Sequence, residues 1–492
     1  MLSHQVNMST NILRKAGIIE RISCAHHVTG YYFSLCLTVR YRLTDGSQLS
    51  ASEWLVLMRQ ATASFSLDHP ALCSGIMNEG SQTPMFVRAN RIDLNHHVVF
   101  ERTSKIFPLS RLLIDLHSSR FSELDTHPGW KLVLSDDSIA NSDSVSATFV
   151  AHHALIDGLS GLVFHRHLSR ALDRILDGSG KRYTDDYLVP RINTELPLPL
   201  EEMIELPTTW QFRIRRVLNK LRPQWLSNGN RNPYWTGNLI TKESMDNYRM
   251  HLRVISLGSD QSQYLRSRCY THATSITGLL HALAASLLAD LLPEAKSFLH
   301  HTPYSMRRWT GLETAEVMVN QTSDSCFAVT WEWLSQFRAS KDDRHDEDLI
   351  WALSACWSSA LKDELRRAPL DNDVALLTND KDWQQVNIEA IGKPRPLTLE
   401  VSNVGSLEGQ EANVPSPGCT KSLSSVDRKI KAERLTFSQS AMTTAAAITI
   451  SVATTEDGID TVITWQDEAV DEDIVLSFCA GMDRKLRDLS HR

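Results

Sequence analysis

Residues 145–158 read Val-Ser-Ala-Thr-Phe-Val-Ala-His-His-Ala-Leu-Ile-Asp-Gly, and this stretch decides the fold. Apolar and β-branched residues over 145–150 predict a buried strand. After Gly158, helical spacing gathers apolar side chains on one face and charged ones on the other. The apolar face comprises Phe164, Leu168, Ala171, Leu172 and Ile175, and the charged face comprises Arg166, Arg170, Asp173 and Arg174. His152 and His153 therefore lie where a strand leads through a loop into a helix, and functional groups often collect in such loops.

Of the four histidine doublets in the chain, only His152-His153 is followed by Asp-Gly at this spacing. A histidine held at a strand end can take a proton from a hydroxyl, amine or thiol and return it to a leaving group. We expect His153 to be this base. A buried histidine pair beside a turn-forming Asp-Gly is the purely structural alternative.

Asp157 has two interpretations. It either orients the His153 ring directly, as in a triad, or turns away to pair with a distant cation and fixes the loop. We prefer the second, because the short sequence separation makes direct contact with the ring awkward. We expect Gly158 to permit the sharp turn into the helix.

A metal site is a further alternative for this region, with His153, Asp157, His165 and His167 as ligands. His165 and His167 are two residues apart on a helix and point to different sides of it, so they do not easily share an ion with the loop. We therefore expect no metal.

Working outward, strand-like and helix-like segments alternate in both halves of the chain, which predicts an α/β fold. Strands are expected at Tyr31–Tyr41, Met250–Leu257 and Leu397–Val404, with helices at Glu53–Phe65, Ile276–Leu292 and Asp471–Leu489. The runs Ala447–Ala453 and Ile459–Trp465 flank Asp457-Gly458 and predict a hairpin with a tight turn. Ser406–Glu433 is polar and is expected to be mobile.

The chain has 492 residues, which predicts more than one packed unit. We expect an N-terminal half over 1–185 that carries the histidine motif, a proline-rich crossover over 186–240, and a C-terminal half over 241–492. A basic run inside the crossover is explained by a solvated helix face, with a phosphate or membrane contact as the alternative. It comprises Arg213, Arg215, Arg216, Lys220 and Arg222, beside Trp210 and Trp225.

Composition excludes several classes of protein. The net charge of −7 gives no field suited to holding a polyanion, so nucleic acid is not expected as a partner. The eight cysteines include no C-x-x-C pair, which argues against a zinc ribbon or a secreted disulfide scaffold. The N-terminus has no apolar h-region of a secretory signal. We expect a cytoplasmic monomer, with peripheral contact to an internal membrane or lipid droplet left open.

The motif His152 to Gly158 resembles the His-His-x-x-x-Asp-Gly motif of acyl-CoA-dependent acyltransferases related to chloramphenicol acetyltransferase. Other segments look like the fungal alcohol O-acetyltransferase branch of that superfamily. They are Gly17-Ile-Ile-Glu-Arg21, Gly30-Tyr-Tyr32, Ser402-Asn-Val-Gly405, Phe437-Ser-Gln-Ser440 and the hairpin that ends at Trp465. The Asp-Phe-Gly-Trp-Gly motif of the plant branch is absent from the sequence, so that branch's substrates are not expected here.

This resemblance implies a two-domain fold in which each half is a mixed sheet flanked by helices, with a channel between the halves. It also implies that His153 deprotonates an acceptor as the acceptor attacks the thioester of acetyl-CoA, with no covalent acyl-enzyme. Asp157 would then pair with Arg307, although Arg308 is an alternative. Ser440 and Asn403 are candidate donors to the tetrahedral oxyanion.

The expected function is acyl-CoA-dependent O-acyl transfer, with acetyl-CoA as co-substrate, a small alcohol or secondary metabolite as acceptor, and no permanently bound cofactor. An amine acceptor or a condensation-type reaction is the alternative within the class, because the same base serves any protonated nucleophile. A non-catalytic scaffold with this fold is the alternative outside it. The intact His153, Asp157 and Gly158 argue against the scaffold.

Overall fold

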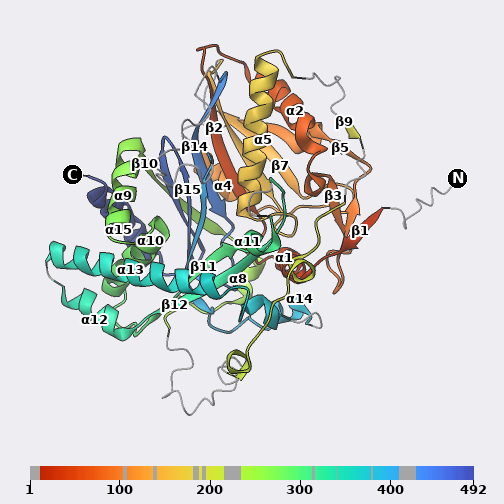
Figure 1. The fold of residues 1–492 in the computed structure, drawn as a ribbon. Coiled ribbons are helices and arrows are strands. Elements are labelled where there is room, and N and C mark those ends of the chain that lie inside the picture. Colours follow the sequence, from red (N-terminus) through yellow and green to blue (C-terminus); the bar gives the residue numbers. More distant parts are fainter. Residues whose placement is uncertain are drawn as a thin grey trace.

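The structure is a computed structural model, and it describes residues 11–102, 108–136, 141–180, 188–190, 195–214, 234–312, 316–340, 342–377, 381–408 and 428–491. Two large mixed sheets dominate it, each backed by helices (Figure 1). This is the α/β architecture expected from the alternation of strand-like and helix-like segments.

The first sheet gathers five of the described strands. In spatial order they are β14 (Ile430–Gln439), β2 (Leu35–Leu43), β8 (Ser144–Ala151), β7 (Trp130–Asp136) and β6 (Val98–Arg102). Only β6 and β7 pair in parallel; the other neighbours are antiparallel. The helices α2 (Ala51–Ser66) and α5 (Gly158–Leu176) cover one face, and α4 (Leu109–His117) packs on the other.

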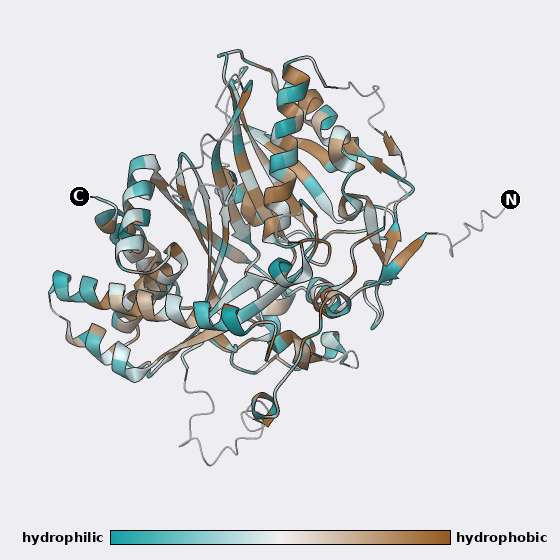
Figure 2. Cartoon of the chain, in the orientation of Figure 1, coloured by the Kyte–Doolittle hydropathy of each residue, from teal (hydrophilic) through white to brown (hydrophobic). Residues whose placement is uncertain are grey.

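The helix α5 follows the predicted pattern closely. Phe164 and Leu168 are fully buried against the sheet, and the arginines on the opposite side are more exposed. Figure 2 shows this division as brown and teal residues along the same helix. The Asp157 side chain accepts a hydrogen bond from the backbone N–H of Ser160 and so caps the helix at its N-terminus.

The second sheet gathers six of the described strands. In spatial order they are β10 (Met250–Gly258), β16 (Gly458–Gln466), β15 (Ala446–Thr455), β13 (Leu397–Ser406), β11 (Phe298–Ser305) and β12 (Thr322–Val329). The strand β13 pairs in parallel with both β11 and β15, and the remaining pairs are antiparallel. The apolar helix α10 (Ile276–Leu291) is almost wholly buried among its neighbours. Those neighbours are α9 (Ser259–Thr271), α12 (Trp331–Ala339), α13 (Asp343–Arg367) and α15 (Glu472–Leu489).

The strand β14 connects the two halves. It comes from the C-terminal part of the chain, yet it pairs with β2 at the edge of the first sheet, from Ile430 opposite Leu43 to Gln439 opposite Leu35. Phe437 and Leu435 lie in the core of that first sheet. The two sheets are therefore not divided at the predicted limits of 185 and 241, because one strand of the predicted C-terminal half completes the N-terminal sheet.

The described part of the crossover is packed against both halves. Arg14 donates to the carbonyl of Pro197 at 2.8 Å, and the Ile18 N–H donates to Glu201 at 2.7 Å. On the other side, Thr209 contacts the Asp371 carboxylate through its N–H and its hydroxyl. Most of the basic run, from Arg215 to Arg222, and Trp225 lie outside the described residues.

Two local expectations need correction. The hairpin forms, but Thr455 pairs with Gly458, so Glu456-Asp457 makes the two-residue loop and Gly458 already belongs to β16. The segment expected to be mobile up to Glu433 contains the start of β14, whose side chains gain burial and ladder bonds from β2. Residues 409–427 of that segment lie outside the described part.

The remaining described elements are short or peripheral. The strands are β1 (Ile12–Lys15), β3 (Ser74–Met77), β4 (Met85–Arg88), β5 (Arg91–Asp93) and β9 (Leu188–Pro190). The helices are α1 (Ile18–Thr29), α3 (Leu94–His97), α6 (Leu200–Met203), α8 (Lys242–Asp246), α11 (Arg307–Thr310) and α14 (Trp383–Ile388). Within the described residues, no single helix is long and apolar enough to cross a membrane; α9 and α10 meet that test only as a pair bent by 89°.

Candidate active site

His153 lies in the loop between β8 and α5 and is half-buried. Its Nδ1 is 2.8 Å from the carbonyl oxygen of Ile156. A carbonyl can only accept, so Nδ1 carries the proton and donates it. The neutral ring therefore keeps its lone pair on Nε2, which is the atom that can act as a base.

Three other residues surround His153. The amide of Asn320 donates to the His153 backbone carbonyl at 2.6 Å, which fixes the main chain of the loop. The Tyr32 ring lies with its centroid 5.5 Å from that of His153. Burial, together with the nearby charge that His153 can carry, lowers the pKa of His26 to about 4. A second imidazole beside His153 thus stays neutral at physiological pH.

Asp157 forms the ion pair with Arg307, and both side chains are buried. Arg307 Nη2 donates to Asp157 Oδ1 at 2.8 Å, and Arg307 Nη1 donates to the carbonyl of Val317 at 2.6 Å. Arg308, the alternative partner, is exposed and lies over the ring of Trp309. Asp157 thus faces a cation from the other half of the chain, while the His153 ring is held by Ile156. This geometry agrees with the interpretation in which Asp157 pairs with a distant cation, and not with the one in which it orients the His153 ring directly.

Ser160 extends this ion pair into a network. Its N–H and hydroxyl both donate to Asp157 Oδ1, at 2.9 and 2.8 Å. Its hydroxyl oxygen in turn accepts from the N–H of Val319 and from Arg307. These hydrogen bonds connect the start of α5 to Arg307 and the segment that follows it. They therefore join the two halves of the chain next to the histidine loop.

Gly158 serves a different purpose from the predicted one. It is the first residue of α5 and has no positive φ. A Cβ at this position would lie 2.5 Å from Cγ1 of Val404 on β13. The motif requires glycine here because the helix approaches the second sheet too closely for a side chain, and not because the turn needs special backbone angles.

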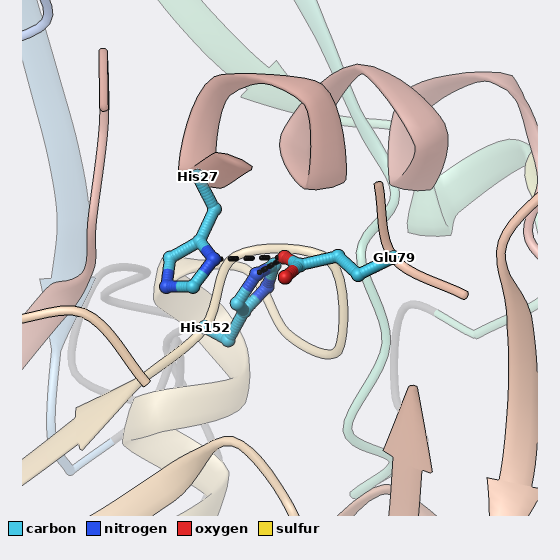
Figure 3. Close-up of side chains that lie close together, drawn as sticks. All are labelled: His27, Glu79 and His152. Carbon is cyan, nitrogen blue, oxygen red and sulfur yellow. Dashed lines mark hydrogen bonds and ion pairs between the residues drawn. The ribbon is translucent and has the colours of Figure 1, made fainter. Parts of the chain in front are cut away.

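His152, the first motif histidine, is buried and lies in a cluster with His27 and Glu79 (Figure 3). Its Nε2 is 2.7 Å from Glu79 Oε1, and His27 Nδ1 is 2.8 Å from the same oxygen. His27 comes from the end of α1 and Glu79 from the turn after β3. Sequence analysis assigned His26-His27 no role beyond being a doublet, and nothing local in the sequence distinguishes Glu79.

Both candidate oxyanion donors, Ser440 and Asn403, make hydrogen bonds to other residues. The Ser440 hydroxyl accepts from the N–H of Ser34 at 3.0 Å, and it has the carbonyls of Ser34 and His117 as acceptors for its one proton, both at 3.1 Å. The Asn403 amide donates to Thr277 at 3.1 Å and accepts from Gly405 at 2.8 Å. The Ser440 hydroxyl therefore has no free proton for an oxyanion. Its hydrogen bonds are made with Ser34, just before β2, and with His117, at the end of α4.

A polar chain leads away from Tyr32 along the second sheet. The Tyr32 hydroxyl donates to Gln439 Oε1 at 3.2 Å, and Gln439 Nε2 lies 3.4 Å from Glu400. Glu400 and Asp324 both contact the ring of His301, at 3.2 and 3.4 Å. Burial alone would lower the pKa of His301, but the two carboxylates outweigh it and raise the pKa to about 10. His301 is therefore a cation at neutral pH.

The four residues considered as metal ligands are not brought together. His165 Nε2 donates to the carbonyl of Leu37 at 2.9 Å, deep in the first sheet. His167 instead contacts Glu316 at 3.1 Å. With His153 bonded to Ile156 and Asp157 to Arg307, each of the four has its own partner.

A mixed-sheet chain in two halves, with a histidine loop between them braced by an Asp–Arg pair, defines the class of chloramphenicol acetyltransferase-like acyltransferases. The chain belongs to the alcohol acetyltransferase family, whose model matches residues 116–486. It is therefore a transferase, and the family implies an acyl-CoA co-substrate and an alcohol acceptor.

Individual relatives agree with this family. A probable alcohol acetyltransferase, FCK4, from Fusarium pseudograminearum is 26% identical over 483 residues, covering 94% of this chain and 93% of the relative. Among solved structures, the TRI3 trichothecene 15-O-acetyltransferase from Fusarium sporotrichioides has a TM-score of 0.68 at 13% identity, covering 97% and 95% of the two chains. The first condensation domain of the calcium-dependent antibiotic synthetase has a TM-score of 0.59 at 13% identity, covering 98% and 97%. Both structural likenesses confirm the expected fold.

Proposed function

We propose that this chain transfers an acetyl group from acetyl-CoA to a hydroxyl of a small alcohol or secondary metabolite, with His153 as the general base. The observation that carries the proposal is the hydrogen bond from His153 Nδ1 to the Ile156 carbonyl. It fixes the tautomer in which Nε2 is the free proton acceptor, and it holds the ring at the half-exposed end of a rigid strand.

The reaction follows from this tautomer. Nε2 takes the hydroxyl proton as the acceptor oxygen attacks the thioester carbonyl, forming a tetrahedral intermediate. Collapse of the intermediate breaks the carbon–sulfur bond and forms the ester. The leaving thiolate takes the proton from Nε2, which releases CoA as a free thiol and restores the neutral ring. The Ile156 carbonyl stabilises the imidazolium that exists between these two transfers, because it accepts the Nδ1–H throughout.

Asp157 and Arg307 support this chemistry indirectly. Their ion pair ties the start of α5 to the segment after β11, so the loop that carries His153 is held from both halves. An acceptor and acyl-CoA that enter between the halves would meet at a base whose position is fixed before they bind.

An amine acceptor, or condensation of carrier-bound acyl groups, remains the alternative, because Nε2 can take a proton from nitrogen as well as from oxygen. A panel of primary alcohols, secondary alcohols and amines, each incubated with acetyl-CoA, separates these reactions. The expected result is release of free CoA thiol, together with a mass gain of one acetyl group on an alcohol.

His153→Ala is the decisive variant. We expect it to fold normally and to lower acetyl transfer by about 10²- to 10⁴-fold, the usual range for loss of a general base. His251→Ala is a matched control, since His251 lies on β10 at the exposed edge of the second sheet and contacts Asp467. Undiminished turnover in His153→Ala with intact circular dichroism would rule out the proposed mechanism.

A further inference from the structure

We propose that Glu79 is a positioning residue of the active site, which holds the histidine loop because its Oε1 accepts a hydrogen bond from His152 Nε2 and lies 2.8 Å from Nδ1 of His27. The inference rests on the proposed function of His153. It concerns three segments that lie far apart in sequence: the end of α1, the turn after β3 and the loop after β8 (Figure 3).

Backbone donors fix the tautomers of both histidines. The Phe121 N–H donates to His27 Nε2 at 3.1 Å, and the Ala154 N–H donates to His152 Nδ1 at 3.0 Å. A ring nitrogen that accepts a hydrogen bond carries no proton, so in each neutral ring the other nitrogen must carry it. These other nitrogens, His27 Nδ1 and His152 Nε2, are the two atoms that face Glu79 Oε1.

The charges agree with this assignment. Burial lowers the pKa of His152 to about 4, so its ring is neutral at physiological pH. Burial acts to raise the pKa of Glu79, but the hydrogen bonds from His152 and His27 outweigh it, and the pKa is lowered to about 2. The carboxylate thus accepts a charge-assisted hydrogen bond from the neutral His152 ring, which is stronger than a neutral one, and His27 Nδ1 lies 2.8 Å from the same oxygen.

The same tautomers argue against a metal ion in this cluster. Two histidines and a glutamate whose ligand atoms all lie within 4.8 Å of one another are a common set for zinc or iron. An ion would need the lone pairs of His27 Nδ1 and His152 Nε2, which would move the ring protons to the opposite nitrogens. There they would point at the N–H groups of Phe121 and Ala154, and donor would face donor. The cluster therefore fits two ring N–H groups, on His27 Nδ1 and His152 Nε2, that face a carboxylate, and it does not fit a divalent cation.

The turn that carries Glu79 is itself held in place. Asn78 adopts a φ of 54°, a left-handed conformation that asparagine tolerates better than most residues. On the other side of Glu79, the backbone carbonyl of Gly80 accepts a hydrogen bond from the Gln384 side chain at 2.7 Å. Glu79 therefore projects from a fixed turn and not from a free loop end.

Glu79 acts on His153 through the adjacent residue. His152 is 1% exposed. The backbone at Gly129 lies so close to it that a Cβ added at Gly129 would be 2.9 Å from the Cβ of His152. With the His152 ring held by Glu79 and Ala154, the backbone that leads into His153 has one orientation. Loss of Glu79 would free the ring and misplace Nε2 of His153.

The test compares Glu79→Ala with Glu79→Gln. For Glu79→Ala we expect kcat to fall by about 10- to 100-fold with the KM for acetyl-CoA unchanged, because the base is displaced while the substrate contacts remain. Glu79→Gln should restore most of kcat, since its amide oxygen can accept the hydrogen bond from His152 as Oε1 does. Asp467→Ala is the matched control, because it removes a carboxylate that contacts a histidine elsewhere, at the exposed His251.

Nitrogen-15 NMR of histidine-labelled protein gives a readout that needs no turnover. In the wild type, the His152 resonances, assigned with His152→Gln, should report a proton on Nε2 and none on Nδ1. This preference should be lost in Glu79→Ala and kept in Glu79→Gln. Inactive wild-type protein with this tautomer would refute the proposed function, whereas active wild-type protein without it would refute the role of Glu79 alone.

Three results would overturn the inference itself. The first is an unchanged kcat in Glu79→Ala while His153→Ala is inactive. The second is a proton on Nδ1 of His152 in the wild type. The third is one equivalent of zinc in the purified protein that is lost in Glu79→Ala, measured by elemental analysis.

Discussion

At the scale of single residues, Asp157 and Arg307 are a charged pair removed from water, with side chains only 1% and 5% exposed. Burial of two charges is costly, and good geometry with additional hydrogen bonds is needed to offset it. The pair has such bonds: Ser160 donates to Asp157, and Arg307 donates to Val317 and Val319. The ion pair holds the motif loop in place, because its hydrogen-bond partners come from both halves of the chain.

Removal of one partner should therefore cost more than removal of both. We expect Arg307→Met to lower the free energy of unfolding by about 3–5 kcal/mol, because the Asp157 carboxylate stays buried without its cation. The double variant Arg307→Met with Asp157→Asn should recover part of that loss. Urea unfolding of the wild type and the two variants measures both effects, and a loss below about 1 kcal/mol for Arg307→Met would show that the pair does not hold the loop.

At the scale of elements, the contact between α5 and β13 sets how closely the two halves approach. Gly158 faces Val404, and one turn later a Cβ at Gly161 would lie 2.3 Å from Cδ1 of Leu37 on β2. Two glycines on one side of the same helix thus allow it to lie against strands of both sheets. The strand β14 reinforces the connection, since Arg434 and Thr436 both contact Asp460 on β16.

Gly158→Ala should destabilise the protein by about 1–3 kcal/mol, the usual range for an overpacked core. A second change, Val404→Ala, removes the clashing Cγ1 and should recover part of the loss in the same background. Gly258→Ala is the control, since a Cβ there meets nothing within 4 Å and its φ is negative. Thermal and urea unfolding measure the stability of these variants. Equal losses of stability in Gly158→Ala and Gly258→Ala would mean that contact with β13 does not restrict the side chain at position 158.

At the scale of the whole molecule, many of the 19 histidines are structural. Burial, the largest cause in each case, lowers the pKa of seven of them to about 3 or 4. They are His26, His69, His97, His117, His152, His165 and His300. His301 is the opposite case, with its pKa raised to about 10 by two carboxylates.

These shifts predict sensitivity to acid. A histidine whose folded pKa is about 4 binds fewer protons when folded than when unfolded, where its pKa is about 6.5. The free energy of unfolding therefore falls as the pH is lowered through this window, by at most about 1.4 kcal/mol per pH unit for each such histidine. His301 gives its full stabilisation below about pH 6.5 and loses it as the pH rises toward 10, so it opposes the acid effect only near pH 7, where the unfolded ring is still largely neutral.

Urea unfolding between about pH 7 and about pH 5 tests this expectation. We expect the free energy of unfolding to fall by several kcal/mol across the range. His117→Gln should reduce the slope, because it removes one buried site that would take up a proton on unfolding. A stability that is flat across this range would contradict the assignment of these rings as buried and neutral.

The sequence by itself determined the class of fold, the family and the position of the histidine proposed as the base. Residues 145–158 could be interpreted alone because strand alternation, helical periodicity and a loop motif are all set by neighbours within a few residues. The partner Arg307 was also within reach, through resemblance to the superfamily motif, and the structure brings it to Asp157 at 2.8 Å.

Only the tertiary structure decided which distant residues complete the site. Glu79 and His27 reach His152 from 73 and 125 positions away, and no local pattern marks them. The same holds for β14 in the first sheet, for the engagement of Ser440 by Ser34 and His117, and for the packing requirement at Gly158. Each depends on which segments the packed core places side by side, and that is set by the burial of the whole chain rather than by periodicity within one segment.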